Sequence, residues 1–234
     1  MHKKFSQYNL PAAISIIFET MEILDPSIAA EVADKLLEIQ AIRLQPEKPF
    51  TWASGWKSPI YCDNRLSLSY PEVRNIIRDQ LVKSVSHFFP TAEAIAGVAT
   101  AGIPQGALIA DKLELPFIYV RSKPKGHGME NMIEGKVTPG QKVVVVEDLV
   151  STGGSSLKAA EDLKNAGFEV LGMVAIFSYG FDVANKNFTD AGVKLVCLSH
   201  YDALLPRAVE RNYITSETLE SLAEWRKDPG SWKQ

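Results

Sequence analysis

The stretch KVVVVEDLVSTGGSS, residues 142–156, joins a run of valines to an acidic pair and a loop of small residues. The valines at 143–146 are β-branched and uninterrupted, which is typical of a strand buried on both faces of a parallel sheet. Glu147 and Asp148 are therefore expected at the carboxyl end of this strand, where open α/β sheets bind their ligands. A helix is expected next, over 157–166. This order predicts a phosphate-binding site.

The loop after the acids has the composition of an anion site. Gly153 and Gly154 let the backbone N–H groups approach a phosphate closely, and Ser151, Thr152 and Ser155 add hydroxyl donors. The loop matches neither the Walker pattern, whose lysine is missing, nor G-x-G-x-x-G. The alternative interpretation is a plain strand-to-helix turn in which the hydroxyls only cap the helix.

The acidic pair indicates which class of phosphate compound the loop binds. Carboxylates repel a phosphate, but they accept hydrogen bonds from the vicinal hydroxyls of a ribose or bind Mg²⁺ through water. A loop for phosphate beside acids for sugar hydroxyls predicts a ribose 5-phosphate ligand.

The composition of the chain limits the remaining possibilities. With 234 residues, 46% hydrophobic and 23% charged, it is long enough for one α/β domain with a sizeable core. A net charge of −3 and a pI near 5.9 give no support for nucleic-acid binding. Cys62 and Cys197 form no CxxC pair and are expected to be reduced. No signal peptide and no membrane-length apolar run is found, so we expect a cytoplasmic protein without membrane contact.

The pattern along the chain predicts one domain, 1–234, of the α/β class. About residues 92–200 form a mostly parallel core, about 1–90 form a helical and extended hood, and 201–234 form a helical tail. Turns are expected at 101–104 and at Leu205-Pro206. The expected strands are 94–100, 116–121, 143–146, 170–179 and 193–199, and the expected helices are 28–39, 70–88, 105–113, 157–166 and 216–227.

Basic residues recur in YVRSKPKGHGMENMIEG, residues 119–135. Arg121, Lys123, Lys125 and His127 stand at alternate positions, and prolines and glycines interrupt regular structure. A long loop of this kind in a compact domain is usually functional, and its charge suits a pyrophosphate. The alternative is a solvated charged loop.

A third stretch, FTWASGWKSPIYCDNR at 50–65, contains Lys57 and Tyr61 among turn-forming residues. By itself it is consistent with a β-turn carrying a buried aromatic residue. Together with 119–135 and 142–156 it resembles the orotate phosphoribosyltransferases, members of the type I phosphoribosyltransferase family, over roughly residues 45–180.

The resemblance implies the type I phosphoribosyltransferase fold, a mostly parallel central sheet flanked by helices with an N-terminal hood. It implies the reaction of orotate with phosphoribosyl pyrophosphate (PRPP) in pyrimidine (UMP) biosynthesis. It further implies Mg²⁺, held mainly by PRPP rather than by the protein, and a homodimer in which the basic loop reaches the neighbouring subunit's site.

Site residues also follow from the resemblance. Lys125, Arg121 and His127 are expected to act in catalysis by stabilising the leaving pyrophosphate. Ser151, Lys57 and Tyr61 are expected to bind orotate. The expected PRPP-binding residues are Arg121, Lys125, His127, Glu147, Asp148, Leu149, Val150, Ser151, Thr152, Gly153, Gly154 and Ser155.

One expected contact has no residue in the sequence. Many family members have an arginine after the sixth strand for the orotate carboxylate, but FSYGFDV at 177–183 contains none. Two other functions remain open at this point: a phosphoribosyltransferase for another nucleobase, and a PRPP-binding regulator without catalysis.

Overall fold

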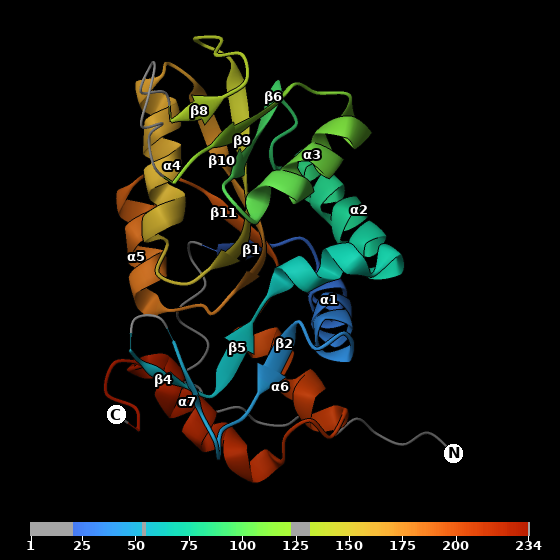
Figure 1. Cartoon of the computed structure of the whole chain (residues 1–234), viewed down its shortest axis with the longest axis vertical. Coiled ribbons are helices and arrows are strands. Elements are labelled where there is room, and N and C mark those ends of the chain that lie inside the picture. The colour runs from blue at the N-terminus through green and yellow to red at the C-terminus, as the bar shows by residue number, and fades with distance from the viewer. Residues whose placement is uncertain (1–20, 53–54, 123–131, 234) are drawn as a thin grey trace.

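The centre of the protein is a seven-stranded sheet (Figure 1). The computed structural model describes residues 21–52, 55–122 and 132–233. The strands run in the order β1-β11-β10-β9-β6-β7-β8, all in parallel pairs except the antiparallel β7–β8 pair, so the predicted fold class is confirmed. Their bounds are β1 Met21–Ile23, β6 Ala94–Val98, β7 Phe117–Val120, β8 Ile133–Glu134, β9 Lys142–Val150, β10 Glu169–Ser178 and β11 Leu195–His200.

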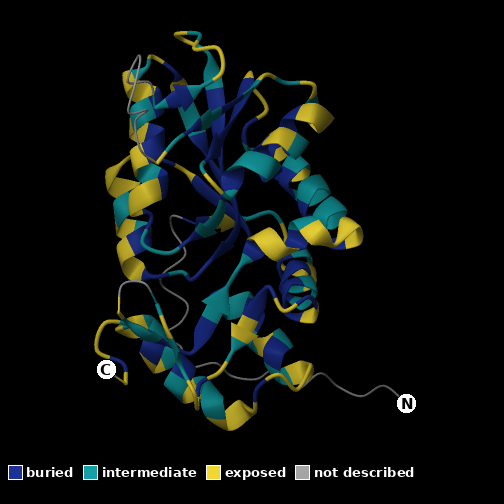
Figure 2. Cartoon of the chain, viewed as in Figure 1, coloured by how far each residue is buried: buried dark blue, intermediate teal, exposed yellow. Residues whose placement is uncertain are grey.

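Helices cover both faces of this sheet. The helices α1 (Pro26–Glu38), α2 (Pro71–Phe88) and α3 (Gly102–Leu113) lie on one face, and α4 (Gly154–Asn165) and α5 (Asp182–Asp190) lie on the other (Figure 1). Val144 and Val146 of β9 belong to the first hydrophobic core, and Val143 and Val145 belong to the second. The valine run is therefore buried on both faces, as the sequence predicts, and the strands form the dark-blue centre of Figure 2.

The start of each helix has a local cause in the sequence. The Asp25 carboxylate accepts a hydrogen bond from the Ser27 amide (2.7 Å) and caps α1, and Pro71 occupies the first turn of α2. The turn expected at 101–104 is wrong, because α3 already begins at Gly102. Pro104 lies in the first turn of the helix, where its missing N–H breaks no helical hydrogen bond.

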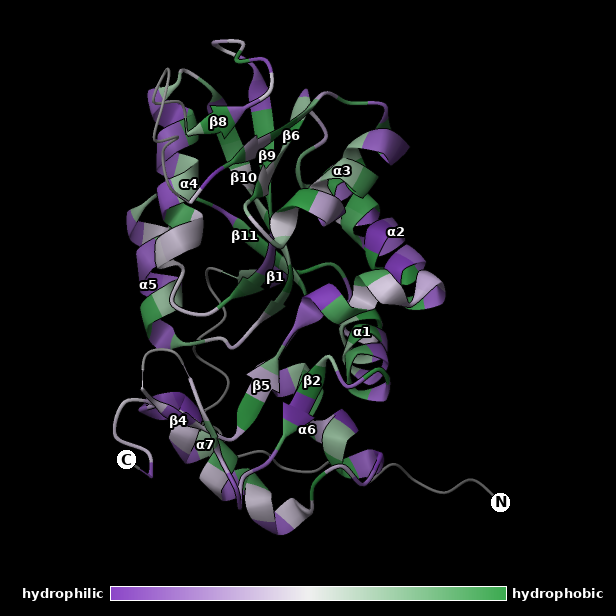
Figure 3. Ribbon diagram, in the orientation of Figure 1, coloured by the Kyte–Doolittle hydropathy of each residue, from purple (hydrophilic) through white to green (hydrophobic). Residues whose placement is uncertain are grey.

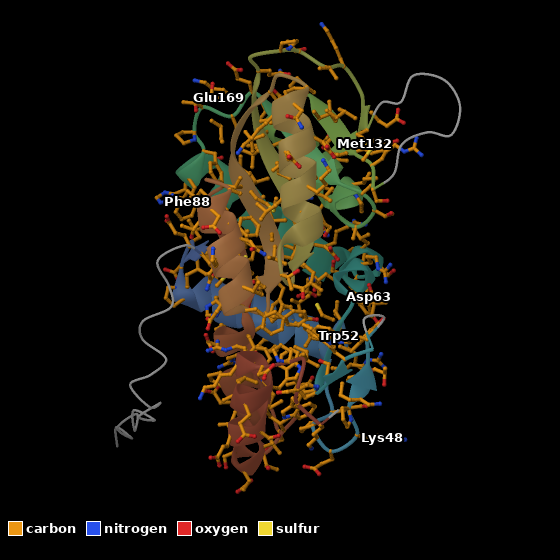
Figure 4. All side chains as sticks on the ribbon, turned by 90° about the vertical axis from the view of Figure 1, so that its left-hand side faces the viewer. Lys48, Trp52, Asp63, Phe88, Met132 and Glu169 are labelled. Atoms are coloured by element: carbon orange, nitrogen blue, oxygen red, sulfur yellow. The ribbon has the colours of Figure 1, made fainter. Side chains whose placement is uncertain are left out.

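The hood was predicted for about residues 1–90, but in the described part of that range β1, α1 and α2 belong to the sheet and its helical layer. A smaller group of short elements next to the sheet is called the hood from here on. It comprises two antiparallel pairs, β2–β5 and β3–β4, and the 3-10 helix η2 (Asn64–Ser69). Figure 4 shows Trp52 and Asp63 between the α/β core and the hood turn that carries Lys48. The strand bounds are β2 Ile42–Leu44, β3 Phe50–Thr51, β4 Lys57–Ser58 and β5 Ile60–Cys62.

The C-terminal elements pack on the same end of the molecule as the hood (Figure 1). They are α6 (Tyr201–Glu210), the 3-10 turn η3 (Ser216–Thr218) and α7 (Leu219–Lys227). The turn predicted at Leu205-Pro206 is wrong, because α6 continues through Pro206. Leu204 and Ala208 are buried on one side of α6, and this packing outweighs the helix-breaking tendency of the proline.

The distribution of polar and apolar residues agrees with this packing. The helices carry polar residues on their outer sides and apolar residues toward the sheet (Figure 3). Both cysteines are free, with Cys197 buried in β11 and Cys62 half-buried in β5. Within the described ranges, no helix has the length and apolar character needed to cross a membrane.

Candidate active site

The acidic pair lies inside a strand rather than after it. β9 extends to Val150 because its backbone pairing with β10 continues through Leu149↔Phe177 and Val150↔Ser178. Glu147 and Asp148 are therefore residues of β9 near its carboxyl end. The valine run alone predicted a strand that ends at residue 146, so the strand is longer than expected. Their backbone is held by the pairing with β10, since the pairing of β9 with β6 ends at Val146.

The loop after β9 turns directly into a helix. α4 begins at Gly154, three residues earlier than predicted, so Ser155 and Ser156 are helical. Gly153 precedes the helix with φ +81°, and a Cβ there would lie 2.7 Å from the Phe188 ring, so the position needs glycine for two reasons. No side chain caps the first N–H groups of α4, which leaves them for an anion.

A second helix begins beside the first. β6 pairs with β9, and the chain turns from β6 into α3 through residues 99–102, again without a side-chain cap. Gly102 packs against β9 so closely that a Cβ would lie 2.3 Å from the backbone oxygen of Val146. Two uncapped helix N-termini thus follow neighbouring parallel strands, so both open at the same sheet edge. This arrangement can bind two anionic groups of one ligand.

The electrostatics of the acidic pair differ from those of free carboxylates. Glu147 is 6% exposed and accepts hydrogen bonds from the Ser156 hydroxyl (3.0 Å) and the Asp148 amide (3.0 Å). Burial, with repulsion from Asp148, raises the pKa of Glu147 to about 8. Burial also raises the pKa of Asp148, although hydrogen bonding to Glu147 and the charge of Arg65 oppose this. Glu147 therefore keeps its proton to a higher pH than a free glutamate does.

Asn64 connects the acidic pair to the hood. Its side-chain amide donates to the backbone oxygen of Asp148 (2.7 Å), and its own Oδ1 accepts from the Cys62 thiol (3.3 Å). Its backbone oxygen accepts from the Ser67 hydroxyl (2.6 Å), which in turn accepts from Gln105 of α3 (3.4 Å). These buried contacts fix the hood relative to both β9 and α3.

Five rings form an aromatic cluster between the hood and the C-terminal helix. Trp225 of α7 is fully buried and lies 5.7 Å from Trp52 of the hood, measured between ring centroids. Tyr179, which follows β10, lies 5.2 Å from Trp52 and 5.8 Å from Trp225. Phe181 and Tyr201 complete the cluster at 5.3 and 5.5 Å from Trp225. The Trp52 ring thus packs against residues that are far from it in the sequence.

The residues predicted to bind the base lie on the hood and at the end of β9. Lys57 of β4 donates to the Thr51 hydroxyl (3.1 Å). Tyr61 of β5 packs on Phe50 (5.6 Å between centroids), and the Arg43 guanidinium carbon lies 4.9 Å from the Tyr61 ring centre. Ser151, half-buried, follows the last residue of β9.

The basic segment is described only at its start. Arg121 follows β7, donates its amide to the Met132 oxygen (2.8 Å), and pairs with Glu134 (3.4 Å). β7 is parallel to β6, so Arg121 lies at the same sheet edge as the acidic pair. Lys125 and His127, the other two residues predicted to act in catalysis, lie outside the described residues.

Metal binding has limited support from side chains. In the described ranges, no three His, Cys, Asp or Glu residues lie close enough together to hold a metal ion. Glu147 and Asp148 offer hard oxygen ligands, which suit Mg²⁺, a cation that is often held by one or two carboxylates, water and ligand phosphates. The donor set therefore fits a magnesium ion shared with a bound phosphate.

Several residues of the site were not identified from the sequence. The 99–102 turn had a local signal, because ATAGIP follows a buried strand and precedes a helix, as the second loop does. Asn64 and the ring of Trp225 had none, because their contacts join segments that are distant in sequence.

Comparisons with known proteins identify the family. The family described as "Phosphoribosyl transferase domain" matches residues 68–200. The chain is 64% identical to the orotate phosphoribosyltransferase of Cytophaga hutchinsonii over 204 residues, which are 87% of this chain and 98% of that protein. It is 57% identical to the orotate phosphoribosyltransferase of Streptococcus pneumoniae over 208 residues, 89% of this chain and 99% of that one.

Solved structures give the same result. The orotate phosphoribosyltransferase of Aeropyrum pernix superposes with a TM-score of 0.68 at 31% identity, over 75% of this chain and 97% of that one. UMP synthase of Leishmania donovani superposes with a TM-score of 0.70 at 30% identity over 84% of this chain, which spans only 42% of that longer protein. The resemblance found in the sequence is confirmed, and the chain belongs to the orotate phosphoribosyltransferase family.

Proposed function

We propose that this protein transfers the phosphoribosyl group of PRPP to orotate, giving orotidine 5′-monophosphate and pyrophosphate. The observation that supports this proposal most strongly is the β9–α4 segment, which combines a buried acidic pair with an uncapped helix N-terminus. Next to it lies the hood, whose Trp52 packs on Tyr179. The end of β9, the start of α4 and the 99–102 turn are called the phosphate half below. The hood, the loop 178–181 and α7 are called the base half.

The phosphate half has one place for each charged part of PRPP. The loop 151–155 and the first turn of α4 bind the 5-phosphate through backbone N–H groups and hydroxyls. Glu147 and Asp148 accept hydrogen bonds from the ribose hydroxyls. The second helix N-terminus, at the 99–102 turn, points its N–H groups at the pyrophosphate.

The reaction needs positioning more than it needs a nucleophilic side chain. The bond from C1 of the ribose to pyrophosphate breaks, and C1 carries positive charge in between. The bond from C1 to N1 of orotate forms as N1 gives up its proton to the leaving pyrophosphate or to water. Arg121, Lys125 and His127 stabilise the charge that develops on the pyrophosphate. His127 acts as a contact to the leaving group. Closing the site excludes water, which would otherwise hydrolyse the sugar.

The proposal also includes the oligomeric state, the metal ion and the cellular compartment. The protein acts as a homodimer in which the basic segment after Arg121 serves the neighbouring subunit's site. Mg²⁺, when bound, neutralises charge on the PRPP oxygens, and Glu147 and Asp148 are the residues that would hold it, directly or through water. Two free cysteines suit a reducing compartment, so we place the enzyme in the cytoplasm.

The test is the loss of the near-ultraviolet absorbance of orotate when the purified protein meets PRPP and Mg²⁺. Uracil and hypoxanthine are tested in parallel as other acceptor bases. We expect a loss with orotate alone. Turnover of another base, or PRPP binding without turnover of any of the three, would contradict the proposal.

A further inference from the structure

The base half has to meet a charged acceptor if it binds orotate, as proposed above. Orotate carries a carboxylate on the ring carbon beside the nitrogen that receives the ribose, and uracil is the same ring without it. A site that selects orotate therefore needs a cation placed in the base half, and a bidentate arginine suits a planar carboxylate best.

Three cations of the hood have other contacts. Arg65 makes a two-pronged pair with Asp63, with 2.6 and 3.0 Å between the guanidinium nitrogens and the carboxylate oxygens. Arg43 lies over aromatic rings on its own sheet. Lys57 donates to the Thr51 hydroxyl. The next cation to consider in the base half therefore lies on its helix, α7.

Arg226 lies on α7, next to the fully buried Trp225. Its side chain is only 16% exposed, and its Nη1 donates to Oδ1 of Asp202 at 2.5 Å. A guanidinium has five N–H donors in a fixed plane, so one bond to Asp202 fixes its orientation without using its capacity for a second anion.

The surroundings of Arg226 place it at the ligand-binding edge of the sheet. Its Nη1 lies 3.9 Å from where a Cβ of Gly180 would stand. Gly180 belongs to the loop after β10, where the Tyr179 amide donates to the Val150 oxygen (3.2 Å) at the end of β9. The Arg226 guanidinium thus lies next to the loop after β10, and that loop is bonded to Val150, the residue before Ser151.

We propose that Arg226 binds the carboxylate of orotate through charge-assisted hydrogen bonds and so selects orotate over neutral pyrimidines. Asp202 is a positioning residue in this arrangement, because it holds the guanidinium toward Gly180. The C-terminal helix therefore contributes directly to substrate choice, besides supporting the hood.

The experiment compares four variants of the full chain in the absorbance assay, with a measured melting temperature for each. Arg226→Gln should raise KM for orotate about 10- to 100-fold, while KM for PRPP and inhibition by uracil stay within about 2-fold of the wild type. Asp202→Asn should give a smaller rise. Arg211→Gln is the matched control, because this arginine is 57% exposed and pairs with Asp34 instead, so orotate kinetics should not change.

Arg226→Lys covers the case in which the glutamine variant does not fold. It keeps the charge but not the planar fork, and should raise KM for orotate by a smaller factor, about 3- to 10-fold. Unchanged KM for orotate in the folded variants would overturn the proposal. So would equal effects of Arg226→Gln and Asp202→Asn on orotate and on uracil, since that pattern would mean that the pair only holds α7. Absence of orotate turnover in the wild type would instead overturn the proposed function.

Discussion

The phosphate half and the base half of the site are stabilised by different kinds of interaction. In the phosphate half, backbone pairing with β6 and β10 fixes β9, and two helices begin with uncapped backbone N–H groups. In the base half, contacts between side chains hold the elements together. The aromatic cluster joins Trp52 of the hood to Trp225 of α7.

This difference has a functional meaning. Backbone donors recognise phosphate in any nucleotide, so a shared phosphate half can serve many substrates. In the proposed site, side chains from distant segments choose the base. Changes in the base half should therefore alter the choice and affinity of the acceptor, whereas changes in the phosphate half should alter PRPP binding and turnover.

The largest expected effect comes from removing one buried ring that lies in or next to each half. Trp225→Ala and Phe188→Ala both empty a buried site, and each should lower the free energy of unfolding by about 3–5 kcal/mol. The ligand effects should differ. Trp225→Ala should raise KM for orotate, and Phe188→Ala, whose ring packs beside Gly153, should weaken PRPP binding.

Denaturant unfolding and steady-state kinetics measure both quantities. If the two variants changed orotate and PRPP binding equally, the division into halves would be wrong.

The next effect concerns turnover alone. Lys125→Ala should lower turnover by at least about 100-fold, the usual scale for one preorganised electrostatic group, and leave the melting temperature nearly unchanged. The exposed Lys136, changed to Ala, is the control and should behave like the wild type. Normal turnover of Lys125→Ala, or a large loss of melting temperature, would contradict the assigned role.

A pH effect should single out the phosphate half. The pKa of Glu147 is about 8 in the folded protein against 4.5 for the free group, so the folded state keeps a proton that the unfolded state loses. Stability without ligand should therefore fall as pH rises from about 5 to 8, by roughly 2–4 kcal/mol. Glu147→Gln has no such proton and should lose less.

Melting temperatures across this pH range test the assignment. Ser156→Ala removes a hydrogen-bond donor to Glu147 but keeps the carboxyl group, so it should retain the pH dependence. A Glu147→Gln variant with the full wild-type slope would show that another group titrates.

The smallest effect is expected on the outer face of α4. Lys158 is 59% exposed and pairs with Glu161 (3.1 Å) and Asp162 (2.8 Å). Exposed pairs of this kind contribute little, so Lys158→Ala should change stability by less than about 1 kcal/mol and leave kinetics unchanged. A calorimetric shift of more than about 4 °C would mean that this helix face supports the loop.

The two halves also differ in how far the sequence predicted them. The phosphate half follows from contiguous residues, because a valine run, two acids and a glycine loop each have a local structural meaning. Its boundaries were less certain, since the pairing of Leu149 and Val150 with β10 extends the strand beyond the acids. Packing of α6 likewise keeps Pro206 inside a helix.

The base half was predicted only in part. The segment 50–65 was identified, but the contact between Trp52 and Trp225 joins positions with no shared local pattern. The same holds for Arg226, whose approach to Gly180 depends on how α7 packs. Long-range side-chain contacts of this kind require the three-dimensional structure.

The position of β9 has a consequence for aggregation. An uncharged run of valines is the kind of segment that pairs with other chains when it is exposed. β9 is the fourth of the seven strands, and the edges are the short β1, with three residues, and β8, with two. Short edge strands offer few unpaired backbone groups to a second molecule. The sheet order therefore keeps the most aggregation-prone segment of the described chain as far as possible from either open edge.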